Sequence, residues 1–286
     1  MSVKLMQGDC LERMKEIPGG VVDMVLTDPP YGTTACKWDS VIPLEPMWEQ
    51  LKRVIKPNGA IVMTASQPFT TTLIASNMKM FKYEWIWEKS HGSFATAKIQ
   101  PLKRHENIIV FGSGRITYNR QMEAVVGKVR DRRMEGFRSS GDKDFTSDTT
   151  GIDSKNYARD YDPKKRNPKS LIKISSERGI HPTQKPVALM EYLIKTYTNE
   201  CETVLDFCAG SGTTGVACAN LNRNFIGIEL DENYFNIALT RIENAQAESG
   251  ASADLNFGFS IRLDPPMSKK DMLEAELLVR KWATSR

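Results

Sequence analysis

The sequence has no apolar run close to the ~20 residues that cross a lipid bilayer. Its N-terminus, MSVKLMQGDC, also lacks the apolar core of a secretory signal peptide. None of the five cysteines belongs to a C-x-x-C pair, which argues against a disulfide framework and against a zinc site. We therefore expect a cytoplasmic protein with reduced cysteines and no bound metal. Contents of 40% hydrophobic and 26% charged residues are typical of globular proteins.

A strong overall charge is also missing, since the net charge is +4, but the basic residues are concentrated in one segment. Residues 115–180 contain 16 Lys and Arg and 10 Asp and Glu, which gives +6 there and −2 for the rest of the chain. Aromatic side chains are interleaved with the basic ones, a mixture that suits phosphate contacts and base stacking. A solvated insertion is the alternative interpretation. The candidate contact residues are Arg132, Arg133, Arg138, Arg159, Lys164, Lys165 and Arg166.

Apolar runs of strand length alternate with helical patterns on both sides of this segment. Strands are expected at 3–6, 21–26, 60–65, 83–89, 106–111, 203–207 and 224–228. Helices are expected at 11–17, 46–55 and 69–80, after Pro186, after the glycine loop as far as Leu221, and after Asp231. The alternation predicts an α/β fold with a doubly wound, mostly parallel, Rossmann-like sheet. A capping box at Ser268 predicts one more amphipathic helix in the tail, residues 249–286.

A glycine loop lies between a predicted strand and a predicted helix in the second half of the chain. Residues 210–215, GSGTTG, match G-x-G-x-x-G, and Glu229 ends the next strand 19 positions after Gly210, where an acid holds ribose hydroxyls. A nucleotide cofactor is therefore expected, and a nicotinamide dehydrogenase is one class that uses such a loop. Asp206, four residues before Gly210, would repel a pyrophosphate but attract the ammonium group of S-adenosylmethionine.

The second unusual stretch, residues 27–31 or TDPPY, directly follows the apolar run at 21–26. Its two prolines have no N–H donors, so the carbonyls of Asp28 and Pro29 point outward as acceptors beside the ring of Tyr31. Such an edge suits a flat group that presents amino hydrogens, whereas a strand-terminating turn is the simpler interpretation. Another triplet, residues 264–266 or DPP, follows no predicted strand and is expected to be a turn.

Together these motifs resemble the DNA amino-methyltransferases of the permuted β class, in which the catalytic motif precedes the cofactor motif. Residues 28–31 are similar to the family's catalytic D-P-P-Y, and residues 206–214 to its D-x-F-x-G-S-G-T-T loop. Residues 181–186, HPTQKP, are similar to the element that lines the methionine end of the cofactor, and Asp9 to the acid that reads its adenine amine. The implied cofactor-binding residues are Asp9, Cys10, His181, Thr183, Lys185, Pro186, Asp206, Phe207, Cys208, Ala209, Gly210, Ser211, Gly212, Thr213 and Glu229.

The resemblance implies transfer of the sulfonium methyl group of S-adenosylmethionine to an exocyclic nitrogen of a base flipped out of double-stranded DNA. The implied catalytic residues are Asp28, Pro29, Pro30 and Tyr31, with Asp28 and the Pro29 carbonyl accepting the amino hydrogens and Tyr31 stacking on the base. Asp at position 28 favours adenine N6 over cytosine N4, because cytosine-N4 enzymes more often resemble S-P-P-Y. A nicotinamide-dependent dehydrogenase and an inactive DNA-binding module are more distant alternatives.

The same resemblance divides the chain into three parts. Residues 1–114 and 181–248 are expected to form the catalytic and S-adenosylmethionine-binding domain, and residues 115–180 a target-recognition insert that binds DNA. The tail at 249–286 is expected to pack against the protein or to form a homodimer contact.

Overall fold

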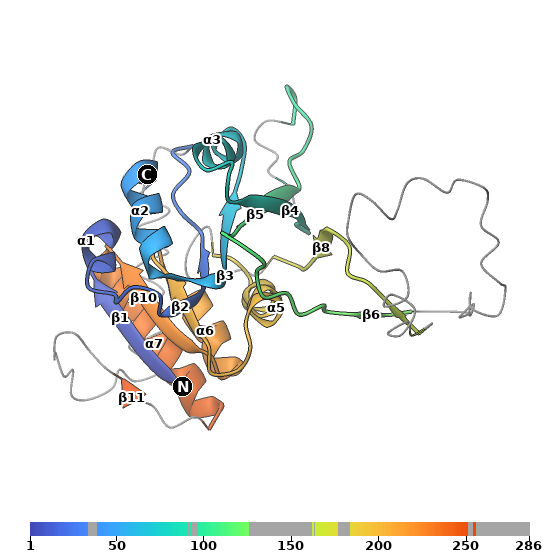
Figure 1. Ribbon diagram of the computed structural model, residues 1–286. Coiled ribbons are helices and arrows are strands. Elements are labelled where there is room, and N and C mark those ends of the chain that lie inside the picture. The colour runs from blue at the N-terminus through green and yellow to red at the C-terminus, as the bar shows by residue number, and fades with distance from the viewer. Residues whose placement is uncertain are drawn as a thin grey trace. The chain divides into compact units, whose positions relative to one another are not determined.

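The structure is a computed structural model, which describes residues 1–33, 39–90, 92, 97–125, 162, 164–176, 184–250 and the backbone of 254–255 (Figure 1). The chain divides into unit 1, Met1–Asn119 and Ser170–Arg286, and unit 2, Arg120–Lys169. Among the described residues, no helix combines the length and the apolar character that crossing a membrane requires.

Unit 1 is built on a nine-stranded sheet with the order β11-β1-β10-β9-β2-β3-β5-β4-β8. All neighbouring strands are parallel except β5, which runs antiparallel to both β3 and β4. The predicted mostly parallel sheet is thus confirmed. The strands are β1 (Ser2–Gln7), β2 (Val22–Thr27), β3 (Ile55–Ala65), β4 (Phe81–Glu88), β5 (His105–Phe111), β8 (Leu171–Lys173), β9 (Thr203–Asp206), β10 (Asn224–Glu229) and β11 (Asp254–Leu255).

Helices cover both faces of this sheet, as a doubly wound fold requires. Two apolar clusters fill the space between the layers, one formed with the first three helices and the other with the last three. Each cluster takes alternate residues of the strands; Met24 and Leu26 face one cluster and Val25 faces the other. The helices are α1 (Cys10–Met14), α2 (Leu44–Val54), α3 (Phe69–Ser76), α5 (Val187–Tyr197), α6 (Thr213–Asn220) and α7 (Glu232–Glu248).

Two element boundaries differ from the sequence prediction by four residues or more. Strand β3 begins at Ile55 instead of 60, because Ile55 already pairs with Val22 before a register shift restores regular pairing at Met24. Helix α3 ends at Ser76 instead of 80, where Asn77 leaves the helical conformation with φ −150° and ψ 54°.

Unit 2 contains a two-stranded antiparallel sheet, in which β6 (Glu123–Ala124) pairs with β7 (Lys165–Arg166). The predicted insert, 115–180, is wider than this unit. Residues 171–173 form β8 and pair with β4, while the N–H of Asn119 donates to the Thr196 carbonyl at 2.7 Å, so both flanks belong to unit 1. The tail helix predicted after Ser268 lies outside the described residues.

The order of the central strands brings distant parts of the chain together. Strands β10 and β9 lie between β1 and β2, although β1 and β2 are consecutive in the sequence. All four strands are parallel, so the residues that follow Gln7, Thr27, Asp206 and Glu229 emerge at the same edge of the sheet (Figure 1). This is the edge at which doubly wound folds bind ligands.

Candidate active site

Asp206 is the link between the two predicted motifs. Its side chain is buried, and Oδ1 accepts a hydrogen bond of 2.7 Å from the Thr27 hydroxyl, one residue before Asp28. Oδ2 accepts from the Thr214 hydroxyl at 2.6 Å, and the N–H of Cys208 donates to Oδ1 at 3.1 Å. Burial nevertheless raises the pKa of Asp206 to about 6, because these donors are neutral and replace only part of the lost hydration. The site therefore contains a buried carboxylate whose hydrogen-bond donors carry no charge.

The glycine loop passes closely over helix α7 before helix α6 begins. Gly212 has a φ of +79°, and a Cβ atom on it would lie 2.8 Å from the Cβ atom of Ala238. Only glycine fits both the left-handed backbone and this close approach. Gly210, also at positive φ, donates its N–H to Glu229 Oε2 at 2.7 Å, while the N–H of Asp231 donates to Oε1 at 2.9 Å. Burial raises the pKa of Glu229 as well.

The turn after β1 lies against the same loop. The N–H of Gly8 donates to the backbone carbonyl of Glu229 at 2.8 Å, and Asp9 caps helix α1 by accepting from the N–H groups of Leu11 and Glu12. The thiols of Cys10 and Cys208 contact each other, and this contact lowers the pKa of Cys10 and raises that of Cys208. Asp9, Asp206 and Glu229 come from three separate stretches of sequence and thus lie around one edge of the sheet.

Asp28 is held by three partners, which come from its own turn, from β3 and from the segment before α5. Its Oδ2 forms an ion pair of 2.6 Å with the ammonium of Lys185, which immediately precedes Pro186, the N-cap of α5. Its Oδ1 accepts from the hydroxyl of Tyr31 at 2.7 Å and from that of Thr64 in β3. Burial acts to raise the pKa of Asp28, but the Lys185 ammonium and the two hydroxyls outweigh it and hold the pKa below its usual value. Asp28 is therefore an ionised and rigidly placed acceptor.

The ring of Tyr31 is also fixed on one side. It stacks on Phe69 with ring centroids 5.5 Å apart and an interplanar angle of 23°, and Lys185 Nζ lies 5.9 Å from the ring centroid. The carboxylate of Asp39 accepts the N–H groups of Tyr31 and Gly32 at 2.8 Å and that of Thr33 at 2.9 Å. This carboxylate holds the backbone immediately after the motif in one conformation.

Comparison with known proteins identifies the family to which the chain belongs. Residues 22–240, which include both motifs, match the family model of N6/N4 DNA methylases. The chain belongs to this DNA methylase family.

Three relatives of the methylase illustrate the match. The Type II methyltransferase M.BglII of Bacillus subtilis is 30% identical over 260 residues, 82% of this chain and 67% of the relative. The DNA adenine methyltransferase YhdJ of Escherichia coli K12 is 27% identical over 266 residues, 84% of this chain and 83% of the relative. A crystal structure of an M1.HpyAVI–SAM complex superimposes with a TM-score of 0.57 at 25% identity, covering 84% of this chain and 99% of that one.

Four residues of the methylase site were not predicted from the sequence as site residues: Asp39, Thr64, Lys89 and Glu106. Lys185 was assigned to the cofactor through the resemblance, yet its ammonium contacts Asp28 at 2.6 Å and Glu106 Oε2 at 3.3 Å. Glu106 in turn binds Lys89 through Oε1 at 2.6 Å. A sequence signal existed only for Glu106, which is a carboxylate at the start of an otherwise apolar strand.

Six predicted contact residues of the methylase lie outside the described residues: His181, Thr183, Arg132, Arg133, Arg138 and Arg159. The other three predicted DNA contacts are in unit 2, where Lys164, Lys165 and Arg166 are exposed on and beside β7. Lys165 Nζ lies 3.9 Å from Asp162 Oδ2, which is too long for strong pairing.

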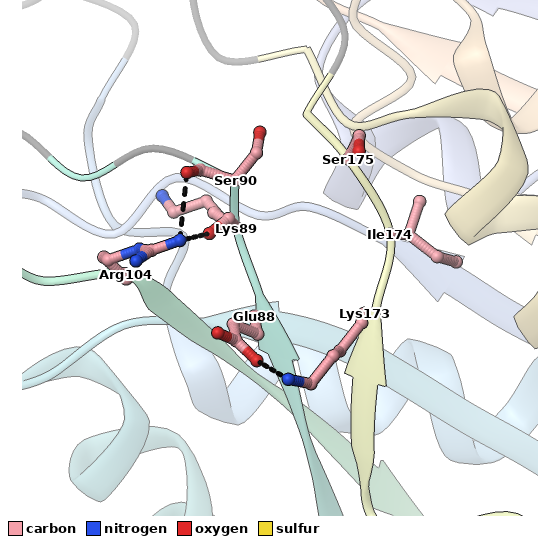
Figure 2. Close-up of a pocket in the computed structure, with 7 residues that line it drawn as sticks. All are labelled: Glu88, Lys89, Ser90, Arg104, Lys173, Ile174 and Ser175. Carbon is pink, nitrogen blue, oxygen red and sulfur yellow. Dashed lines mark hydrogen bonds and ion pairs between the residues drawn. The ribbon is translucent and has the colours of Figure 1, made fainter.

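A groove at the ends of β4 and β8 lies next to Lys89 in unit 1 of the methylase (Figure 2). Arg104 donates to the carbonyl of Ser90 at 3.0 Å, and Lys173 forms an ion pair of 3.0 Å with Glu88. Its polar lining therefore includes three basic side chains and one acidic side chain. The same Lys89 pairs with Glu106, so one lysine belongs both to the groove and to the series of ion pairs that leads through Glu106 and Lys185 to Asp28.

Proposed function

We propose that the protein is a site-specific DNA methyltransferase that transfers a methyl group from S-adenosylmethionine to the exocyclic N6 of a flipped-out adenine in double-stranded DNA. The observation that carries the proposal is the Thr27–Asp206 hydrogen bond of 2.7 Å. It joins the acceptor motif at the end of β2 to the glycine loop at the end of β9. A methyl donor held in that loop would thus lie beside a base held at Asp28.

The carboxylates around the glycine loop fit S-adenosylmethionine better than a dinucleotide. Three carboxylates, Asp9, Asp206 and Glu229, surround the edge, and a pyrophosphate would be repelled there. Burial raises the pKa of Asp206 to about 6, which is the behaviour of a buried carboxylate without a cation. The ammonium group of S-adenosylmethionine supplies that cation. Glu229 would hold the ribose and Asp9 the adenine amine.

The chain's part in the reaction is to place and polarise the acceptor nitrogen. The bound cofactor supplies an electrophilic methyl group. The amino nitrogen of adenine is a weak nucleophile because its lone pair is conjugated with the ring. Hydrogen bonds from its two N–H groups to Asp28 and to the Pro29 carbonyl favour a pyramidal nitrogen with an available lone pair. These acceptors bind most strongly as the nitrogen becomes positive in the transition state.

Adenine is favoured over cytosine by two observations. The motif begins with Asp28 instead of serine, and one relative with 27% identity is described as a DNA adenine methyltransferase. Cytosine N4 is the second candidate, because the matching family model covers both kinds of enzyme.

The test is transfer of tritium-labelled methyl groups from S-adenosylmethionine to plasmid DNA by the purified full chain. We expect labelled DNA with the wild type, and at least hundredfold less with Asp28→Ala, which removes the main acceptor. Asp264→Ala, a change in the other Asp-Pro-Pro triplet, is the matched control and should label DNA like the wild type. No label in any DNA, without binding of S-adenosylmethionine, would refute the proposal.

Sequencing of modified bases in the labelled DNA identifies the methylated base and its recognition sequence. N6-methyladenine is the expected product, and N4-methylcytosine would select the second candidate. The role of unit 2 in target recognition, a homodimer and a cytoplasmic location stay predictions.

A further inference from the structure

A chain of alternating charges runs from the catalytic carboxylate to the groove of Figure 2. It consists of Asp28, Lys185, Glu106 and Lys89, with successive N–O distances of 2.6, 3.3 and 2.6 Å. The Lys185 side chain is 6% exposed and that of Glu106 is 14% exposed, whereas Lys89 at the end is 27% exposed. The inner charges therefore act on one another with little screening by solvent.

Glu106 is the unusual member of this chain. Its Oε2 atom is buried and meets no hydrogen-bond donor of good geometry in the part of the protein that the structure describes. The partner of this atom is the Lys185 ammonium at 3.3 Å, which lies 0.7 Å closer to Asp28. A buried carboxylate oxygen whose partner is held more closely by another carboxylate is incompletely compensated, which costs free energy and points to a functional role.

The acceptor capacity of Asp28 suggests that role. Two hydroxyl groups, those of Tyr31 and Thr64, lie against Oδ1, and the Lys185 ammonium lies against Oδ2. A carboxylate offers about four lone-pair positions, so Oδ2 keeps one for an N–H of the target base. That N–H would lie beside an ammonium, whose positive charge destabilises the positive charge that develops on the acceptor nitrogen. A second carboxylate beside the ammonium offsets this repulsion with its negative charge.

We propose that Glu106 is a positioning residue for methyl transfer, which shares the Lys185 ammonium with Asp28 and so keeps Asp28 a strong acceptor. This inference rests on the proposed function. With Glu106 ionised, the three inner groups carry a net charge of −1 facing the acceptor nitrogen. With Glu106 neutral, Lys185 neutralises Asp28 alone and the net charge is zero. The effect concerns the transition state, since the ground-state base is neutral.

The test compares Glu106→Gln with Glu84→Gln in steady-state methylation. Glu84 is a matched control, because its Oε2 accepts from Asn107, the next residue along β5, and it has no place in the charge chain. We expect Glu106→Gln to lower kcat by roughly tenfold, with KM for DNA and for S-adenosylmethionine within twofold of the wild type. Glu84→Gln should match the wild type. An unchanged kcat, or a loss seen only in KM, would overturn the inference.

Two further variants separate this role from a structural one. Glu106→Asp keeps the charge at a longer distance, so kcat should fall only a few fold, and a kcat equal to the wild type would count against the inference. In a Lys185→Met background, measured in single turnovers, Glu106→Gln should cost less than twofold because the shared cation is gone. A full tenfold cost there would show that Glu106 does not act through Lys185.

A measurement of the Asp28 pKa does not depend on methyl transfer, so it tests the inference separately from the proposed function. In an NMR titration of the side-chain carboxyl carbons, Glu106→Gln should lower the pKa of Asp28 further, because Lys185 then belongs to Asp28 alone. The other groups acting on Asp28, namely Tyr31, Thr64 and Asp206, are unchanged in this variant. An unchanged Asp28 titration would refute the inference, whereas wild-type protein that transfers no methyl group would refute the function.

Discussion

The buried carboxylate of Asp206 should make both stability and cofactor affinity depend on pH. Its pKa is raised from 3.8 to about 6 in the folded protein, so the folded state holds the proton more tightly than the unfolded state. A raised pKa contributes stability that is present below about pH 4 and is lost as the pH rises through about 6. The full difference corresponds to ~3 kcal/mol, of which ~2 kcal/mol falls between pH 4.5 and 7.5.

Denaturant unfolding of the wild type and of Asp206→Asn at several pH values measures this contribution. Other groups titrate in the same range, so the informative quantity is the difference between the two proteins at each pH. We expect the wild type to lose ~2 kcal/mol relative to Asp206→Asn between pH 4.5 and 7.5. A difference that is independent of pH would refute the assignment of a raised pKa to Asp206.

Cofactor binding should show the opposite trend, because in the proposed site the ammonium of S-adenosylmethionine would bind the ionised form of Asp206. At pH 5 only about one tenth of Asp206 is ionised, so the Kd measured by calorimetry should be roughly tenfold weaker than at pH 8. 5′-Methylthioadenosine, which has no ammonium, should bind with much less pH dependence. Equal slopes for the two ligands would place the ammonium elsewhere.

Two further predictions concern the loop and unit 2. Gly212→Ala should lower the free energy of unfolding by roughly 2–4 kcal/mol, because the left-handed backbone is strained and the new Cβ atom overlaps Ala238. Gly250→Ala is the control, since Gly250 is also at positive φ but has open space around it, and it should cost only ~1 kcal/mol. Equal losses in denaturant unfolding would show that the overlap is relieved. Replacing Lys164, Lys165 and Arg166 together by alanine should weaken DNA binding and reduce the slope of log K against log salt by up to ~3. Lys15→Ala, which removes an exposed lysine paired with Glu12, is the control and should leave the slope unchanged. An unchanged slope in the triple variant would exclude these three residues from the phosphate contacts.

The parts of the molecule that follow from local pattern could be predicted from the sequence. The strands with continuous apolar runs, such as β2 and β9, bury their side chains on both faces, so their composition alone identifies them. The glycine loop and the carboxylates beside it could be predicted because each lies at a strand end, and strand ends converge in this fold.

The contacts across the sheet could not be predicted in the same way. The Asp28–Lys185 pair joins residues 157 positions apart, and the element that carries Lys185 resembled a cofactor-lining segment. Thr64 and Glu106 lie within strands whose period indicates burial but not what their polar atoms meet. The pairing of residues 171–173 with β4 could not be predicted either, because β8 is only three residues long, too short to show a period.

The strand order has a consequence for how the protein is made. On the ribosome, the N-terminal segment with β1 to β5 is complete long before β9 and β10 are synthesised. Until then, the sheet lacks the two strands that separate β1 from β2, so two edges with unpaired backbone groups are exposed in the nascent chain. The central sheet can close only after residue 229 has left the ribosome. Translation arrest between β5 and β9 should therefore yield an aggregation-prone intermediate that depends on chaperones.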